Sequence, residues 1–244
     1  MCGRFTLTHP TEAVAALFRY ESEDKAAEEF PPRYNIGPTQ PIVTIRQEMS
    51  RHVMRLVRWG LVPSWVKDPQ QFTLLINARA ETARAKPSFR GSMRHHRCLV
   101  PATGYYEWRR EGGQKQPFYM RPKNGELFAM AGLWADWSGP DGNLIDSGAL
   151  LTQPANEALS GIHHRMPIVL TPDLFDDWLN VSQIDAPEAH RLLKPVPEDF
   201  FEAIPVSSRV NHIRNDDSDL INRVETDTNI EAPQTAKDEQ LDLF

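Results

Sequence analysis

Short apolar segments separated by turn-forming residues are the feature that most constrains how this chain can fold. These segments are rich in β-branched or aromatic residues, and Gly, Pro, Asn and Asp cluster between them. They lie at residues 42–45, 53–59, 72–76, 118–120, 126–133, 148–151 and 203–206. This length and composition predict β-strands. We therefore expect an α+β fold with a mainly antiparallel, barrel-like β core.

Helices are expected only at the periphery of this core. An apolar stripe formed by Val14, Leu17 and Phe18 predicts a short amphipathic helix near the amino terminus. Pro172 suits the first position of a second helix, over residues 172–178. Asp185 and Glu188 form a capping-box pattern that predicts a third helix, extending to about residue 193.

The charge distribution separates a nearly neutral body from an acidic tail. The net charge is −6, but residues 215–244 hold nine acidic and two basic residues, so this segment carries −7 and the rest +1. We expect one domain over residues 2–222 and a disordered tail over 223–244. Within the body, residues 79–97 hold six basic side chains and one acidic one, which is compatible with a nucleic-acid-binding face or a solvated surface.

The last five residues differ from the rest of the tail because apolar side chains reappear there. Gln240, Leu241, Leu243 and Phe244 lie in a segment that has no core of its own in which to bury them. The pentapeptide resembles the motif by which bacterial replication and repair proteins bind the sliding clamp. We therefore expect a clamp-binding peptide at the end of a flexible tether.

Composition argues against several classes of protein. The chain has two cysteines and no CxxC spacing, so we expect free thiols, no disulfide framework and no metal or other cofactor. Cys98 lies in an apolar stretch and is expected to be a buried structural thiol. The absence of a run of 18 apolar residues and of a cleavable leader predicts a cytoplasmic protein without a membrane span.

Cys2 stands directly after the initiator methionine, and this position gives it unusual chemistry. Removal of Met1 would leave an α-amine and a thiol on one residue. An α-amine has a pKa of about 7.7 to 8.0 and a thiol one near 8.5, so modest local tuning makes either group nucleophilic. Together the two groups can condense with an aldehyde to form a five-membered thiazolidine.

Six segments show that the chain resembles a known family. They are MCGRF at 1–5, RYNI at 33–36, WGLVPSW at 59–65, INARAET at 76–82, PATGYYEW at 101–108 and HHRMP at 163–167. In this order, over residues 2–212, they are similar to the signatures of the SOS response-associated peptidase (SRAP) domain. The resemblance implies a protein that shields abasic sites in single-stranded DNA by covalent cross-linking. Gly37 departs from the family pattern, in which alanine is more usual at this position.

The resemblance implies a role for four residues in catalysis. Cys2 matches the nucleophile, and Asn77 matches the asparagine that orients the cysteine and the sugar. Glu107 matches the catalytic glutamate, which would shuttle protons as the carbinolamine loses water. His163 matches the histidine that assists ring opening and reversal of the cross-link, with His164 as the alternative by adjacency.

Other residues are expected to contact DNA. Arg4, Arg79 and Arg165, with Arg84 as a weaker addition, would hold phosphates, because a guanidinium matches the geometry of phosphate oxygens. Three further side chains would stack on bases beside the lesion or, equally, pack in the core. They are Trp59, Trp65 and Pro38.

Two alternatives to this interpretation remain open from the sequence. The first is an N-terminal nucleophile amidohydrolase of the glutamine amidotransferase type, because such enzymes also begin with Met-Cys-Gly. The second is a non-catalytic single-strand DNA-binding protein that is recruited to the sliding clamp. The favoured reading predicts a monomer at the nucleoid or replication fork, with lyase character and, through removal of Met1, autopeptidase or hydrolase character.

Overall fold

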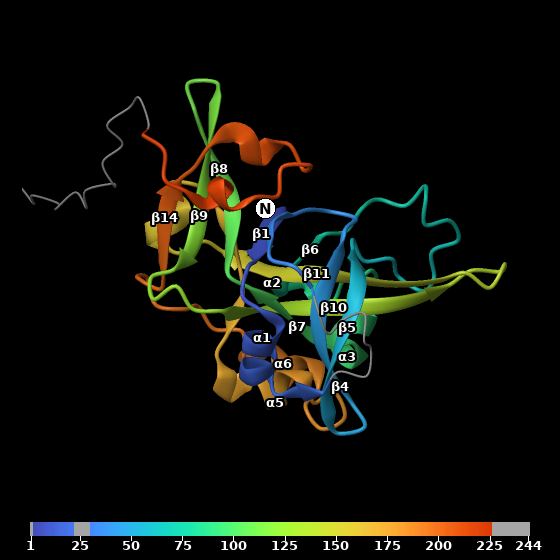
Figure 1. Ribbon diagram of the computed structural model, residues 1–244. Helices are drawn as coiled ribbons and strands as arrows, with labels where there is room; N and C mark the ends of the chain where they lie inside the picture. Colours follow the sequence, from blue (N-terminus) through green and yellow to red (C-terminus); the bar gives the residue numbers. More distant parts are fainter. Residues whose placement is uncertain (1, 22–29, 226–244) are drawn as a thin grey trace, which may run out of the picture.

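Five strands close into a barrel at the centre of the molecule (Figure 1). The computed structural model describes residues 2–21 and 30–225. The barrel strands are β4 (Pro41–Glu48), β5 (Arg51–Trp59), β7 (Arg97–Ala102), β10 (Phe128–Ser138) and β11 (Leu144–Pro154). Four neighbouring pairs are antiparallel, and β11 closes the ring on β5 in parallel. A ring with an odd number of strands cannot alternate direction throughout, so closure requires one parallel pair. The expected α+β fold with a barrel-like core is confirmed.

Four short strands extend the barrel sheet. They are β2 (Tyr20–Glu21) on β5, β6 (Asn77–Arg79) and β12 (Arg165–Pro167) on β11, and β13 (Val169–Leu170) on β10. Both β6 and β12 therefore pair with the carboxyl-terminal half of β11. This arrangement places Asn77 and the segment before Arg165 at the same end of the barrel.

A second sheet of five strands stands beside the barrel, in the order β14-β9-β8-β1-β3. Its strands are β14 (Phe201–Pro205), β9 (Gln114–Pro122), β8 (Gly104–Glu111), β1 (Arg4–Leu7) and β3 (Arg33–Ile36). Thr6 Oγ1 on β1 lies 2.8 Å from Thr103 Oγ1 and 2.9 Å from the hydroxyl oxygen of Tyr119. Phe5 packs edge-on against Trp59 of the barrel, with ring centroids 5.2 Å apart. The strand β1 thereby joins the second sheet to the barrel.

Helices are short and lie around the sheets, as the sequence predicted. They are α1 (Thr11–Phe18), α2 (Ala80–Ala83), α3 (Arg90–His95), α4 (Glu157–Ser160), α5 (Phe175–Leu179) and α6 (Ala186–Arg191), with 3-10 turns η2 (Pro172–Leu174), η3 (Ser208–Asn211) and η4 (Ser218–Ile221). The predicted helix over 172–178 is divided between η2 and α5. Asp185 caps α6 by accepting a hydrogen bond from the Glu188 amide at 2.8 Å. Within the described residues, no helix has the length and apolar character needed to cross a membrane.

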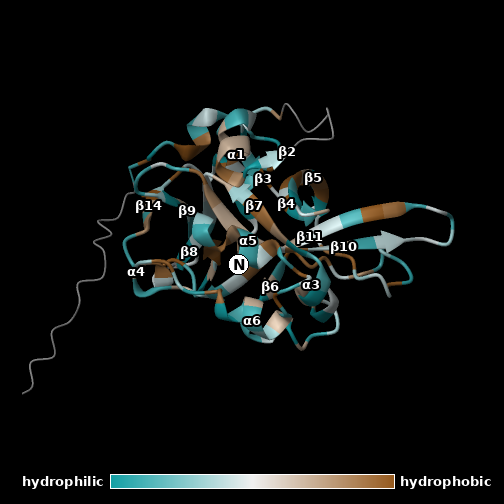
Figure 2. Ribbon diagram, turned by 90° about the horizontal axis from the view of Figure 1, so that it is seen from below, coloured by the Kyte–Doolittle hydropathy of each residue, from teal (hydrophilic) through white to brown (hydrophobic). Residues whose placement is uncertain are grey.

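One predicted strand, over residues 72–76, is wrong. Only Leu75 forms an isolated bridge there, to Leu61, and the strand that follows begins at Asn77. The hairpin of β10 and β11 projects from the barrel (Figures 1 and 2), and the loop after β5 packs against it. Phe72 of this loop meets Trp65 edge-on at 5.6 Å. Phe72 therefore covers the hairpin, whereas Leu75 and Ile76 pack against the main core and Leu74 is exposed.

The other predicted strands are all present in the sheets, but several elements had no prediction. The missed strands β1, β3 and β8 carry mixed polar and apolar residues, and β7 is buried at every position and so lacks alternation. Cys98 lies on β7 and is fully buried, as expected. Arg97 is also buried and donates hydrogen bonds to the backbone oxygens of Trp178 and Ile184, so it is removed from the basic surface expected for residues 79–97.

Candidate active site

Cys2 lies two residues before the start of β1, buried at the junction of the barrel and the second sheet. The strand positions it because β1 pairs on both sides, with β8 and with β3. Burial raises the pKa of the Cys2 thiol above its usual value, and the negative charge of Glu107 raises it further. The thiol is therefore protonated in this environment and would need a nearby group to accept its proton.

Asn77 holds the backbone of Cys2 from the barrel side. Its Nδ2 donates a hydrogen bond of 2.8 Å to the Cys2 carbonyl oxygen. Asn77 begins β6, whose parallel pairing with Leu150 of β11 fixes its place at the end of the barrel. Its Oδ1 is buried and has no hydrogen-bond partner within the described part of the chain. This acceptor is therefore available to an amine or a substrate hydroxyl.

Glu107 approaches Cys2 from the second sheet. It lies on β8, one residue beyond the pair formed by Tyr106 and Arg4, which places it beside the residues that precede β1. Only 3% of its surface is exposed, and this burial raises the pKa of the carboxyl group. A carboxyl group with a raised pKa keeps its proton at a higher pH than an exposed glutamate does, so it can donate that proton and then take it back.

His163 completes the group from the segment between α4 and β12. Its Nδ1 lies 3.7 Å from Glu107 Oε1, 3.0 Å from the Arg165 amide nitrogen and 3.2 Å from the Arg165 carbonyl oxygen. An amide N–H can only donate, so Nδ1 accepts from it in the neutral ring, whereas a protonated Nδ1 can donate to the carbonyl oxygen. Burial lowers the pKa of His163. The neighbouring His164 is exposed and stacks on His163, with ring centroids 4.3 Å apart.

The four residues expected to act in catalysis thus meet at one place, from four separate segments of the chain. A cleft of about 790 Å³ opens over Glu107 and His163. Its rim is positively charged because it includes Arg4, Arg110 and Lys115. Among the residues that the structure describes, no three or more His, Cys, Asp and Glu side chains are grouped to hold a metal ion.

Arg110 and Lys115 were missed by the sequence analysis. Both lie on the hairpin formed by β8 and β9, where they occupy opposite positions in the antiparallel register. Arg110 follows Glu107 by three residues in the chain, and that proximity to a motif residue was the available signal. The pairing of Arg110 with Lys115 could not be read without the hairpin.

Arg165 is placed differently from the expectation that it binds phosphate. Only 8% of its surface is exposed. Its guanidinium donates to both carboxylate oxygens of Glu81, at 2.5 and 3.0 Å, and to the Thr152 backbone oxygen at 2.6 Å. This pairing lowers the pKa of Glu81. Arg165 therefore holds the segment that carries His163 against β11 and the residues after β6.

The remaining residues expected to bind DNA are distributed between core and surface. Trp59 is fully buried and its indole N–H donates to the Ile76 backbone oxygen at 3.0 Å, so it packs in the core and offers no face for stacking. Pro38 is half-buried in the turn between β3 and β4. Arg79 and Arg84 are exposed beside α2 but do not line the cleft. The expected clamp-binding residues 240–244 lie outside the described residues.

Comparison with known proteins places the chain among proteins named for abasic sites. Residues 1–213 match the family model described as SOS response associated peptidase (SRAP). The chain is 39% identical over 222 residues to abasic site processing protein YoqW of Bacillus subtilis, covering 91% of this chain and 99% of that protein. It is 31% identical to abasic site processing protein YedK of Escherichia coli, covering 92% and 100%. A crystal structure of a Bacteroides thetaiotaomicron protein superposes with a TM-score of 0.81 at 28% identity, covering 92% and 100%.

Proposed function

The chain belongs to the SRAP family, and we propose that it captures abasic sites in single-stranded DNA through a covalent bond to Cys2. The observation that carries this proposal is the convergence of Asn77, Glu107 and His163 on the buried amino-terminal cysteine. The relatives are named for abasic sites, which indicates the lesion, and the aminothiol of mature Cys2 has a chemistry that suits this lesion. An abasic deoxyribose in its open form is an aldehyde, the group with which an aminothiol condenses.

The reaction balances without an added reagent. The α-amine of mature Cys2 attacks C1′ of the open sugar, and the resulting carbinolamine loses water to form an imine. The thiol then adds across the C=N bond, with sulfur bonding to carbon and the thiol proton passing to nitrogen. One C–N and one C–S bond form, the C=O bond breaks, and one water molecule leaves. The product is a thiazolidine that links Cys2 to the DNA.

Glu107 is suited to the proton transfers at the carbinolamine. Its raised pKa keeps a proton on the carboxyl group at pH values where an exposed glutamate is ionised, so it can protonate the departing hydroxyl. His163, 3.7 Å away, would return the proton. We assign to the same pair the reverse reaction, in which the imine is hydrolysed and the sugar is released.

Asn77 would orient both reactants. Its amide N–H already fixes the Cys2 carbonyl, and the buried Oδ1 is placed to accept a hydrogen bond from the Cys2 amine or a sugar hydroxyl. A hydrogen bond to the neutral amine leaves the nitrogen lone pair free for attack. The amine exists only after Met1 is removed, and we propose that the hydrolytic activity in the family name applies to this step.

An intact-mass measurement tests the proposal directly. The purified protein is incubated with a single-stranded oligonucleotide that carries one abasic site. The expected result is a protein without Met1 that gains the mass of the oligonucleotide less one water. A protein that lacks Met1 and gains no mass would refute covalent capture and favour the reversible binding protein described above.

The rim of the cleft would hold the DNA backbone. Arg110 and Lys115 together offer two cationic contacts, so replacing both with glutamine is expected to weaken reversible binding. Each phosphate contact to a single strand contributes about 0.7 to the slope of log affinity against log salt, so the double variant should lower this slope by about 1.4. The measurement uses DNA with a tetrahydrofuran site, which cannot open to an aldehyde.

A matched control for the rim variant is Lys123→Gln, because Lys123 is exposed and lies outside the cleft. We expect this change to leave the salt dependence as in the wild type. An equal slope for the wild type and the Arg110→Gln, Lys115→Gln variant would remove the hairpin from the DNA-binding surface. Arg79 and Arg84, exposed beside α2, would then be the stronger candidates for phosphate contacts.

We also propose that residues 240–244 bind the sliding clamp. The support is the sequence, in which Leu241, Leu243 and Phe244 end a polar, acidic segment. Truncation after Glu239 is expected to abolish clamp binding in a calorimetric titration while cross-linking to abasic DNA continues at the wild-type rate. Undiminished clamp affinity in the truncated protein would refute this role.

A further inference from the structure

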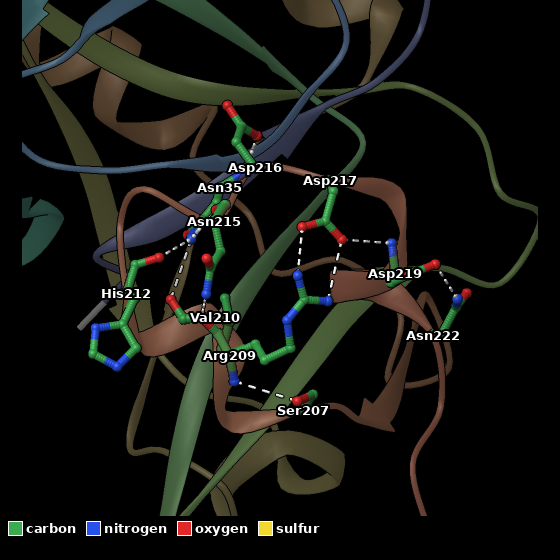
Figure 3. Close-up of polar contacts among 10 residues, drawn as sticks. All are labelled: Asn35, Ser207, Arg209, Val210, His212, Asn215, Asp216, Asp217, Asp219 and Asn222. Atoms are coloured by element: carbon green, nitrogen blue, oxygen red, sulfur yellow. Dashed lines mark hydrogen bonds and ion pairs between the residues drawn. The ribbon is translucent and has the colours of Figure 1, made fainter.

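A segment near the carboxyl end of the described chain packs against the second sheet (Figure 3). We call residues 207–217 the strap; it contains η3 and follows β14. Asn211 of the strap lines the cleft and accepts a hydrogen bond from the indole N–H of Trp108 at 2.7 Å. The strap therefore forms one wall of the site, although none of its residues was expected to take part.

Asn35 on β3 is the centre of the contacts that hold the strap. Its side chain is fully buried. The amide Nδ2 donates to the backbone oxygens of Val210, His212 and Asn215, at 3.2, 3.2 and 2.8 Å (Figure 3). Its Oδ1 accepts a hydrogen bond of 2.9 Å from Arg4. One buried amide thus joins the strap to the first strand, and both ends of that amide are used.

Arg4 is bound by the strap as well as by Asn35. One of its terminal nitrogens also donates to the Val210 backbone oxygen at 2.6 Å, and the other donates to the Asn211 backbone oxygen at 3.3 Å. These contacts set the direction of the guanidinium where it lines the cleft. Because only Gly3 separates Arg4 from Cys2, they also hold the start of β1.

The amino-terminal residue is therefore held from two sides. Asn77 binds the Cys2 carbonyl from the barrel, and the strap binds Arg4 from the second sheet. Chain termini open readily unless such contacts fix them. The hydrogen bond to Cys2 and those to Arg4 together fix the position of Cys2 relative to Glu107 and His163.

The strap is itself closely fitted to β3. Asp216 accepts hydrogen bonds from the amide N–H groups of Tyr34 and Asn35. A Cβ on Gly37 would lie 2.2 Å from Cδ1 of Ile213 in the strap. A methyl group at position 37 would therefore displace the end of the Ile213 side chain.

We propose that the strap positions Cys2 and that Asn35 is the residue that couples the strap to Arg4. The proposal rests on the proposed function, because this positioning orients Cys2 for capture of the aldehyde. Without the Asn35 amide, three strap carbonyls and Arg4 lose their common partner. The start of β1 would then open locally while the barrel remains folded.

The two cysteines of the chain provide an internal test. Both are fully buried, but Cys2 lies two residues from Arg4, which the strap binds, and Cys98 lies in the barrel. In Asn35→Ala, alkylation of Cys2 by iodoacetamide under native conditions is expected to accelerate at least about tenfold relative to Cys98, as measured by peptide mass spectrometry. The maximal single-turnover rate of cross-linking is expected to fall by about tenfold.

Two controls separate positioning from lost stability. Phe175→Leu removes the stacking of Phe175 in α5 on Phe18 in α1, at the other end of the molecule from the strap (Figure 1). Because α5 packs on β7, which carries Cys98, this variant should not raise the alkylation of Cys2 relative to that of Cys98. Asp216→Ala, which removes the acceptor of the Tyr34 and Asn35 amide N–H groups, should raise the Cys2 to Cys98 ratio. This variant also tests the positioning role of the strap if Asn35→Ala does not fold.

An equal increase in the alkylation rates of Cys2 and Cys98 in Asn35→Ala would overturn the positioning role of the strap, because it would show global opening alone. A wild-type protein that forms no adduct would instead overturn the proposed function. The alkylation ratio is measured without DNA, so it tests the positioning role of the strap whether or not the wild type forms an adduct.

Discussion

Replacing Cys2 with alanine is expected to abolish the stable adduct with abasic DNA while reversible binding persists. The variant keeps the α-amine after Met1 is removed, so an imine can still form, but no thiol is present to close the ring. An imine hydrolyses readily, whereas in the thiazolidine the C1′ carbon of the sugar is bonded to both the nitrogen and the sulfur of Cys2. We expect stable adduct to fall by at least about 100-fold on denaturing gels, and to reappear when borohydride reduces the imine.

The second cysteine supplies the control for this experiment. Cys98→Ala removes a fully buried thiol from β7 and should leave the adduct unchanged. Borohydride distinguishes the roles of the two groups on Cys2, because a variant that is trapped only after reduction has lost the thiol step and kept the amine step. Stable adduct from Cys2→Ala without reduction would refute the thiazolidine mechanism.

Replacing Glu107 with glutamine is expected to slow cross-linking by about 100-fold or more, because a positioned general acid typically contributes at least this much. The amide has the shape of the carboxyl group but cannot transfer a proton. The measurement is the single-turnover rate with saturating protein, which separates chemistry from binding. Glu126→Gln, at an exposed position outside the cleft, is the matched control and should react at the wild-type rate.

Glu107→Gln is expected to lower the reaction rate but not the stability of the protein at neutral pH. Burial raises the pKa of Glu107 in the folded state above its unfolded value, so the folded protein binds this proton more tightly. The stability from the protonated form is complete below the unfolded pKa of about 4.3 and is lost as pH rises through the folded pKa. Glu107→Gln should therefore melt at least as high as the wild type at neutral pH, and this advantage should vanish at low pH.

Thermal unfolding followed between about pH 4 and pH 8 checks this sign. A variant that reacts slowly and melts higher has lost a catalytic group. A variant that reacts slowly because it is poorly folded would melt lower at every pH. A wild-type rate in Glu107→Gln would remove this residue from the chemistry.

The class of the fold was predictable from the sequence because strand length and turn composition are local properties. The segment at 72–76 shows the limit of that argument. Its residues have the composition of a strand, but Phe72 packs on Trp65 in a loop that covers the β10–β11 hairpin. Composition reports that a segment is apolar, and only packing decides which neighbour buries it.

The proposed chemistry also comes from the sequence. Removal of Met1 would leave an amine and a thiol on Cys2, and the family motifs predicted Asn77, Glu107 and His163 as its partners without coordinates. Tertiary structure decided how these groups interact. Contact between segments far apart in the chain raises the pKa of the Glu107 carboxyl group and leaves the buried Asn77 Oδ1 without a hydrogen-bond partner among the described residues.

Tertiary structure also decided which similar residues lie at the surface. Arg4 and Arg165 both stand in motifs, yet Arg4 lines the cleft and Arg165 is buried against Glu81. Arg110 and Lys115 belong to the rim only because a hairpin sets them opposite each other. A residue type specifies which bonds a side chain can make. Which of those bonds form, and which remain for a ligand, depends on the burial and the partners that the complete fold supplies.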